Sequence, residues 1–135
     1  MHHIAPPLAG NLLGAADGQF VLAEWQDQGG NPGKKILIAP THVHHSDDEA
    51  WYVLEGRLRF RIGEDEVEAV PGTAVMVPRG TVHTYWNPFG GPARYIIVMT
   101  PNIHRLIQAI HAMPVRSREL LEEVFEHHDS SLVPD

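Results

Sequence analysis

Residues 42–56 read HVHHSDDEAWYVLEG, and this stretch holds three side chains that can meet at one point. His42 and His44 are two positions apart, so on an extended strand both imidazoles project to the same side. Glu49 follows after the polar segment 46–48, which can turn the chain or form a bulge. We therefore expect two imidazole nitrogens and one carboxylate oxygen to converge.

A second stretch, residues 72–87, reads GTAVMVPRGTVHTYWN. Its histidine follows a Pro-x-Gly turn and can supply a third imidazole from another strand. Three imidazoles and one carboxylate, with coordination positions left open, suit one divalent ion of iron, manganese, nickel, cobalt, copper or zinc. The predicted ligands of this ion are His42, His44, Glu49 and His83.

The composition limits the other possible chemistries. The 135 residues include ten histidines and no cysteine, which excludes disulfides, thiolate metal sites and a cysteine nucleophile. An apolar content of 43% predicts a folded globular protein, and a formal charge of −7 argues against nucleic acid or an anionic membrane as partner. With no signal-peptide pattern and no apolar run of about 18 residues, we expect a soluble, cytoplasmic protein that binds a small molecule.

Short apolar runs separated by turn residues extend from Phe20 to Met99, whereas residues 1–19 are rich in Pro and Gly and predict an irregular arm. The closely spaced strands predict an all-β sandwich, jelly roll or barrel. The predicted strands are Phe20–Trp25, Lys35–Pro40, Ala50–Leu54, Arg57–Ile62, Glu66–Val70, Ala74–Val77, Val82–Trp86 and Arg94–Met99.

The hydrophobic period changes to a helical one after Met99, which predicts a helical tail over residues 100–135. Thr100-Pro101 is a suitable helix start, and Pro114 stops the first helix. Ser117 can cap a second helix that runs from about Arg118 to His128.

Residues 57–62 alternate strictly between arginine and an apolar side chain. A period of two places the three arginines on one face of a strand and the three apolar residues on the other. Two interpretations follow: the arginines face solvent, or they line a site for an anionic substrate.

The two stretches resemble the two signature motifs of the cupin superfamily. The first motif has its His-x-His, Glu and Gly at His42, His44, Glu49 and Gly56, while its opening Gly is replaced by Ile36. The second motif is matched throughout, at Gly72, Pro78, Gly80, His83 and Asn87. The resemblance implies one cupin domain over residues 1–135: an arm at 1–19, a double-stranded β-helix (a small jelly-roll barrel) at 20–99 and the two-helix tail at 100–135.

The tail from Thr100 onward is similar to that of single-domain bacterial cupins related to quercetin (flavonol) dioxygenases. This resemblance implies a metal-dependent dioxygenase acting on a small aromatic or enol-type molecule, with Glu49 as both ligand and general base. The alternatives are a metal-dependent isomerase or lyase acting on a polar small molecule, and a binding protein without catalysis. Cupins are commonly dimers, so a homodimer is also expected.

Strand alternation gives candidates for a substrate pocket. If Glu49 and His83 point into the barrel, residues two and four positions along each strand do so too. This alternation gives Trp51, Val53 and Tyr85 as candidates, and Met76 and Met99 are further candidates. Among the other histidines, His45 is expected to have a structural or supporting role and His104 and His111 to lie on the surface, while His2, His3, His127 and His128 have no assigned role.

Overall fold

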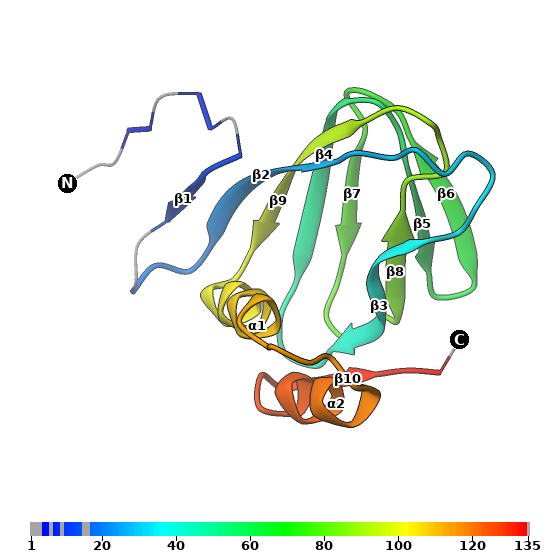
Figure 1. The fold of residues 1–135 in the computed structure, drawn as a ribbon. Coiled ribbons are helices and arrows are strands. Elements are labelled where there is room, and N and C mark those ends of the chain that lie inside the picture. The colour runs from blue at the N-terminus through cyan, green and yellow to red at the C-terminus, as the bar shows by residue number, and fades with distance from the viewer. Residues whose placement is uncertain (1–3, 6, 9, 15–16, 135) are drawn as a thin grey trace.

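The computed structural model describes residues 4–5, 7–8, 10–14 and 17–134. Two antiparallel five-stranded sheets face one another, and both helices lie at one end of the resulting barrel (Figure 1). The first sheet has the order β1 (Leu12–Gly14), β2 (Val21–Asp27), β9 (Ala93–Met99), β4 (Glu49–Glu55) and β7 (Ala74–Val77). The second has the order β10 (Ser130–Leu132), β3 (Leu37–His44), β8 (His83–Trp86), β5 (Leu58–Ile62) and β6 (Asp65–Ala69).

The core fills the space between the two sheets. Alternate side chains of β4 and β5 point inward, and Trp51, Val53, Leu58 and Phe60 are almost completely buried. The Trp51 and Phe60 rings meet edge to face with their centroids 5.2 Å apart, a favoured aromatic geometry. The period-two patterning therefore gives the jelly-roll barrel that the sequence predicts.

The strands from β2 to β9 confirm the eight strand predictions, although β3 continues past the predicted end at Pro40 to His44. The two flanking segments differ from expectation. The arm contains β1, which pairs with β2 as an edge strand. The tail is not purely helical, because Ser130–Leu132 forms β10 and pairs with the end of β3 from His42 to His44. Such short edge strands lack a run of alternating residues long enough to be recognised from sequence.

The two predicted helices are present as α1 (Pro101–His111) and α2 (Arg118–Glu126). The Thr100 hydroxyl accepts a hydrogen bond from the Ile103 amide, and Ser117 caps α2 in the same way. Within the described part of the chain, neither helix is long and apolar enough to cross a membrane.

The alternating strand 57–62 presents its arginines outward. Leu58 and Phe60 are buried in the core, whereas Arg57 and Arg59 pair with Glu68 and Glu66 on the neighbouring strand β6, at 3.5 and 3.8 Å. The solvent-facing interpretation of this pattern is therefore correct, and these two arginines do not line a substrate site.

Candidate metal centre

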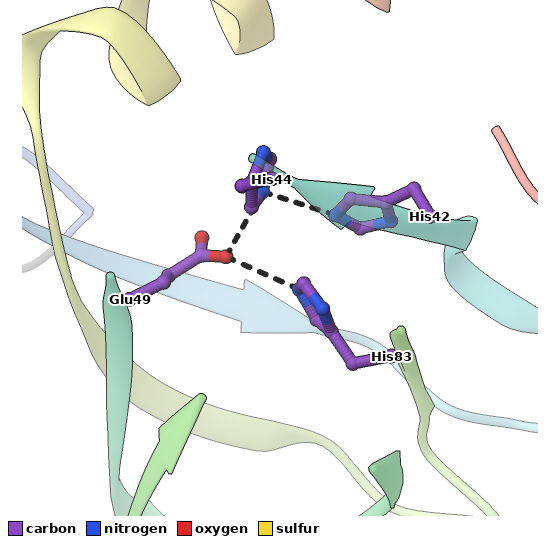
Figure 2. A group of neighbouring side chains, drawn as sticks. All are labelled: His42, His44, Glu49 and His83. Atoms are coloured by element: carbon purple, nitrogen blue, oxygen red, sulfur yellow. Dashed lines mark hydrogen bonds and ion pairs between the residues drawn. The ribbon is translucent and has the colours of Figure 1, made fainter. Parts of the chain in front are cut away.

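The four predicted ligands come together at the end of the barrel, contributed by both sheets. His42 and His44 lie on β3, and His83 lies on β8, directly paired with His42 in the sheet register. Glu49 begins β4 in the opposite sheet, because the chain turns through residues 45–48 after β3. Figure 2 shows the three imidazoles and the carboxylate pointing toward one another.

Short distances join the ligand atoms of this cluster. His42 Nε2 lies 3.2 Å from His44 Nε2, and Glu49 Oε1 lies 3.4 Å from both His44 Nε2 and His83 Nε2. The four ligand atoms lie within 4.8 Å of one another, and all four residues are buried. Two ligands bound to one ion at about 2.1 Å and separated by 90–109° would lie about 3.0–3.4 Å apart, so the spacing suits a metal ion.

Hydrogen bonds on the outer side of each ring determine which nitrogen faces the centre. His42 Nδ1 donates to the Pro40 carbonyl oxygen at 2.5 Å, and His83 Nδ1 donates to the Thr81 carbonyl oxygen at 2.9 Å. A carbonyl can only accept, so both rings carry a proton on Nδ1. Each neutral ring then turns an Nε2 lone pair toward the centre, as a metal ligand requires.

Without an ion, the inner atoms have poor partners. If His44 also turns an Nε2 lone pair inward, as a metal ligand requires, two lone pairs lie 3.2 Å apart and repel one another unless a cation lies between them. Glu49 Oε1 and His83 Nε2 are buried and have no hydrogen-bond partner among the described residues. Buried polar atoms are normally satisfied, so this donor set fits a bound cation.

The protonation states of two ligands agree with this fit. Burial lowers the pKa of the His42 imidazole, and the neighbouring His83 and His44 rings lower it further, to about 3. Burial by itself raises the pKa of the Glu49 carboxyl, but the His44 and His83 imidazoles at 3.4 Å outweigh it when they donate a proton to the carboxylate, and lower the pKa to about 2. At neutral pH the cluster therefore offers a neutral imidazole and an ionised carboxylate.

A cavity of about 410 Å³ opens onto the cluster between the barrel and the two helices. Three of the ligands reach it, namely His42, His44 and Glu49. The rest of its wall is mainly apolar, with the barrel residues Trp25, Leu37, Ile38, Ala39, Pro40, Trp51, Tyr85 and Ile97 and the tail residues Ile103, Leu106, Ile107, Ile110, Leu121 and Phe125. Two basic residues of the tail, His111 and Arg116, also line it.

Only two of the five predicted pocket residues line this cavity. Trp51 and Tyr85 line the cavity, whereas Val53 is fully buried in the core and does not reach it. Met76 is 59% exposed because its neighbours on β7 take the inward positions, so it does not face the lumen as predicted; like Glu49, it lines a second cavity instead. Met99 is buried and also lines this second cavity of about 350 Å³, so it too lies outside the cavity with the apolar wall.

The tail contributes residues that sequence reasoning did not assign to the site. The Phe125 ring lies against His42, with centroids 5.3 Å apart, and Ser130 Oγ lies 2.7 Å from His44 Nδ1. The helical spacing of apolar residues predicts only that Phe125 packs against the barrel. No sequence pattern points to Ser130, because its position depends on the pairing of β10 with β3.

The other histidines have varied surroundings. His45 Nε2 bonds Ser131 Oγ at 2.8 Å, which agrees with a supporting role, and the His111 ring lies 6.0 Å from Trp25 at the wall of the cavity. His128 Nδ1 bonds the Val124 carbonyl oxygen at 2.7 Å. His104 is partly buried on α1, His127 is the C-cap of α2, and His2 and His3 lie outside the described residues.

The barrel is similar in sequence and in structure to known proteins. Quercetin 2,3-dioxygenase of Bacillus subtilis (strain 168) is 33% identical over 69 residues, which are 51% of this chain and 19% of that protein. A crystal structure of a sugar phosphate isomerase from a cupin superfamily, from Silicibacter pomeroyi, is 28% identical with a TM-score of 0.52, over 62% of this chain and 51% of the other. The chain thus spans about one fifth of the first relative and half of the second.

A crystal structure of a cupin protein from Bacteroides fragilis extends the similarity of fold. It is 11% identical with a TM-score of 0.58, and the match covers 90% of this chain and 92% of the other. The family model of the cupin domain matches residues 32–99, just over half of the chain, and includes all four residues of the cluster. The chain therefore belongs to the cupin family, as its two motifs predict.

Proposed function

We propose that this protein is a mononuclear metal-dependent dioxygenase that acts on a small, largely apolar, aromatic or enol-type molecule. The observation that carries the proposal is the buried cluster of three histidines and one glutamate at the base of an apolar cavity. The similarity to a quercetin 2,3-dioxygenase supports it, over the part of that relative that this chain spans.

One set of residues would bind the metal, and another would surround the substrate. His42, His44, Glu49 and His83 would hold one divalent transition metal. The metal, when bound, supplies Lewis-acid and redox chemistry for a reaction between the substrate and dioxygen. The tail helices line one side of the cavity with apolar side chains, which would limit the access of bulk water to the reacting groups.

Glu49 is proposed to have a second role, as the general base toward an acidic hydroxyl of the substrate. Its Oε1 faces the imidazoles, and Figure 2 shows the other carboxylate oxygen turned away from His83. A pKa of about 2 makes this carboxylate a weak base, so only a substrate hydroxyl made acidic by its own conjugation would give it a proton.

The isomerase alternative rests on the resemblance to a sugar phosphate isomerase from a cupin superfamily. A sugar phosphate presents many hydroxyls and a strong negative charge, which require polar partners. Arg57 and Arg59 point outward, and the mainly apolar wall adds only two basic side chains of the described residues, Arg116 and His111, to the ligand cluster, which are few partners for such a molecule. The dioxygenase proposal fits the cavity better.

Oxygen uptake tests the proposal. The protein is loaded separately with iron, manganese, nickel or cobalt, and oxygen consumption is measured with a panel of flavonols and catechols. We expect uptake that depends on both metal and substrate and that is lost in His83→Ala. Ligand binding by calorimetry without any oxygen or ligand consumption would instead support the binding-protein alternative.

We also propose an oligomeric state and a class of partner. The first is the homodimer, for which size-exclusion chromatography with light scattering is the test. The second is the restriction to small-molecule partners, which agrees with the negative net charge.

A further inference from the structure

The last strand of the chain reaches the metal cluster. β10 pairs with the end of β3 that carries two of the ligands, and Ser130 lies opposite His44 in the register. Ser130 is only 2% exposed, and its Oγ lies 2.7 Å from His44 Nδ1. The family match ends at residue 99, so this serine lies outside the part of the chain that the cupin model describes.

The direction of the hydrogen bond follows from a third group. Ser130 Oγ also lies 3.1 Å from the His128 carbonyl oxygen, to which it donates its proton. A hydroxyl has one proton, so Ser130 Oγ must accept the hydrogen bond from His44. The His44 ring is then protonated on Nδ1, and its Nε2 is free to face Glu49 and His42.

His42 and His83 obtain the same orientation from backbone carbonyls two residues before them, Pro40 and Thr81. His44 differs, because its Nδ1 depends on a side chain 86 positions away in the sequence. The His44 ring is therefore oriented by a long-range contact, which exists only when the tail is docked.

Further contacts hold this part of the tail against the chain that follows His44. The His45 amide donates to the Asp129 carbonyl oxygen at 2.9 Å, and the Ser46 hydroxyl donates to the Asp129 carboxylate. The Asn102 side-chain amide donates to both Asp47 Oδ2 and the His128 carbonyl oxygen, each at 2.8 Å. These contacts fix the backbone immediately before Ser130.

We propose that Ser130 is a positioning residue of the metal centre, which fixes the His44 ring in the Nδ1-protonated form and so makes Nε2 a metal ligand. The inference rests on the proposed metal site but concerns residues outside its four ligands. Hydrogen-bond partners of ligating histidines commonly change metal affinity about 10–100-fold when removed.

The test compares Ser130→Ala with Ser131→Ala. Both serines lie on β10 and both bond a histidine, but Ser131 bonds His45, which is not one of the predicted ligands. Co²⁺ affinity is measured by chelator competition, and the coordination environment by visible absorption. We expect Ser130→Ala to weaken Co²⁺ binding about 10–100-fold and change the spectrum, Ser131→Ala to stay within about 2-fold, and Ser130→Thr to restore both.

Nitrogen NMR of the histidine rings in the metal-free protein supplies a second readout. We expect the His44 ring of the wild type to be protonated at Nδ1, and circular dichroism to show that the variants are folded. A wild-type His44 ring protonated at Nε2, or equal Co²⁺ affinities for the two alanine variants, would overturn the inference. If the wild type fails to bind Co²⁺, the proposed metal function fails, while the ring assignment still decides the role of Ser130.

Discussion

His42 Nε2 and His44 Nε2 face one another at 3.2 Å, although neither neutral ring has a proton to place between them. Each ring already uses its Nδ1 proton on an outer acceptor, Pro40 for the first and Ser130 for the second. A pair of lone pairs at this distance is favourable only around a cation.

Removing any one ligand should lower the metal content of the protein. We expect the metal content to fall from about one ion per chain to a small fraction of that value in the variants His42→Ala, His83→Ala and Glu49→Gln. The reason is that the three remaining donors hold a divalent ion less tightly. Elemental analysis of protein of known concentration is the measurement. His45→Ala is the matched control, since this neighbouring histidine bonds Ser131 and should leave the stoichiometry intact.

The stability of the metal-free protein should fall on acidification. In the unfolded chain His42 binds a proton below about pH 6.5, whereas its folded pKa is about 3. Between these values the unfolded state binds more protons, so the free energy of unfolding decreases by up to about 1.4 kcal/mol per pH unit as the pH falls. Glu49, with a folded pKa of about 2 against an ordinary 4.5, adds a loss in the same direction below pH 4.5.

Urea denaturation at pH values from 7 to 3 measures this dependence. His42→Gln removes the titrating ring, so its stability should change less between pH 6.5 and 4.5 than that of the wild type. Parallel curves for the two proteins over that interval would contradict the assignment to His42.

The tail should contribute to stability through Phe125, which is 2% exposed and lies against His42. Truncation of such a buried ring leaves a cavity, so Phe125→Ala should lower the free energy of unfolding by about 3–5 kcal/mol. Leu120 lies on the same helix and is 42% exposed, so Leu120→Ala should change it by no more than about 0.5 kcal/mol. Equal effects in chemical denaturation would show that α2 is not docked as described.

Filling the apolar cavity should prevent ligand binding without removing the metal. Ile107 lines the cavity from α1, and Gln108 is the next residue and is exposed. We expect Ile107→Trp to weaken the binding of a flavonol at least about 10-fold, since the larger ring occupies its space. Metal content should be unchanged, and Gln108→Trp should bind the flavonol like the wild type in a fluorescence titration. A normal affinity in Ile107→Trp would place the ligand elsewhere.

The outward-facing arginines should be dispensable for the site. Arg57 and Arg59 form exposed pairs with glutamates of β6, and such pairs contribute about 0–1 kcal/mol each. We therefore expect Arg57→Gln and Arg59→Gln to bind metal and flavonol normally and to unfold within about 1 kcal/mol of the wild type. Loss of ligand binding in either variant would favour the polar substrate of the isomerase alternative.

Much of the fold could be predicted because its signals are local. The eight central strands follow from apolar runs and turn residues, and the helix starts follow from Thr100 and Ser117. Met76 was placed wrongly because β7 is only four residues long, and a shift of one position reverses every side chain on such a strand.

The sequence by itself determined the ligand chemistry of the cluster and the shared direction of its two neighbouring histidines. The His-x-His spacing on a strand puts His42 and His44 on one side, and the residue types restrict the ligands to nitrogen and oxygen. Only the tertiary structure decided that Trp51 and Tyr85 face the apolar cavity and that Phe125 and Ser130 complete the surroundings of the ligands. Those contacts join residues far apart in the chain, so they arise from sheet pairing and helix docking, which no local pattern encodes.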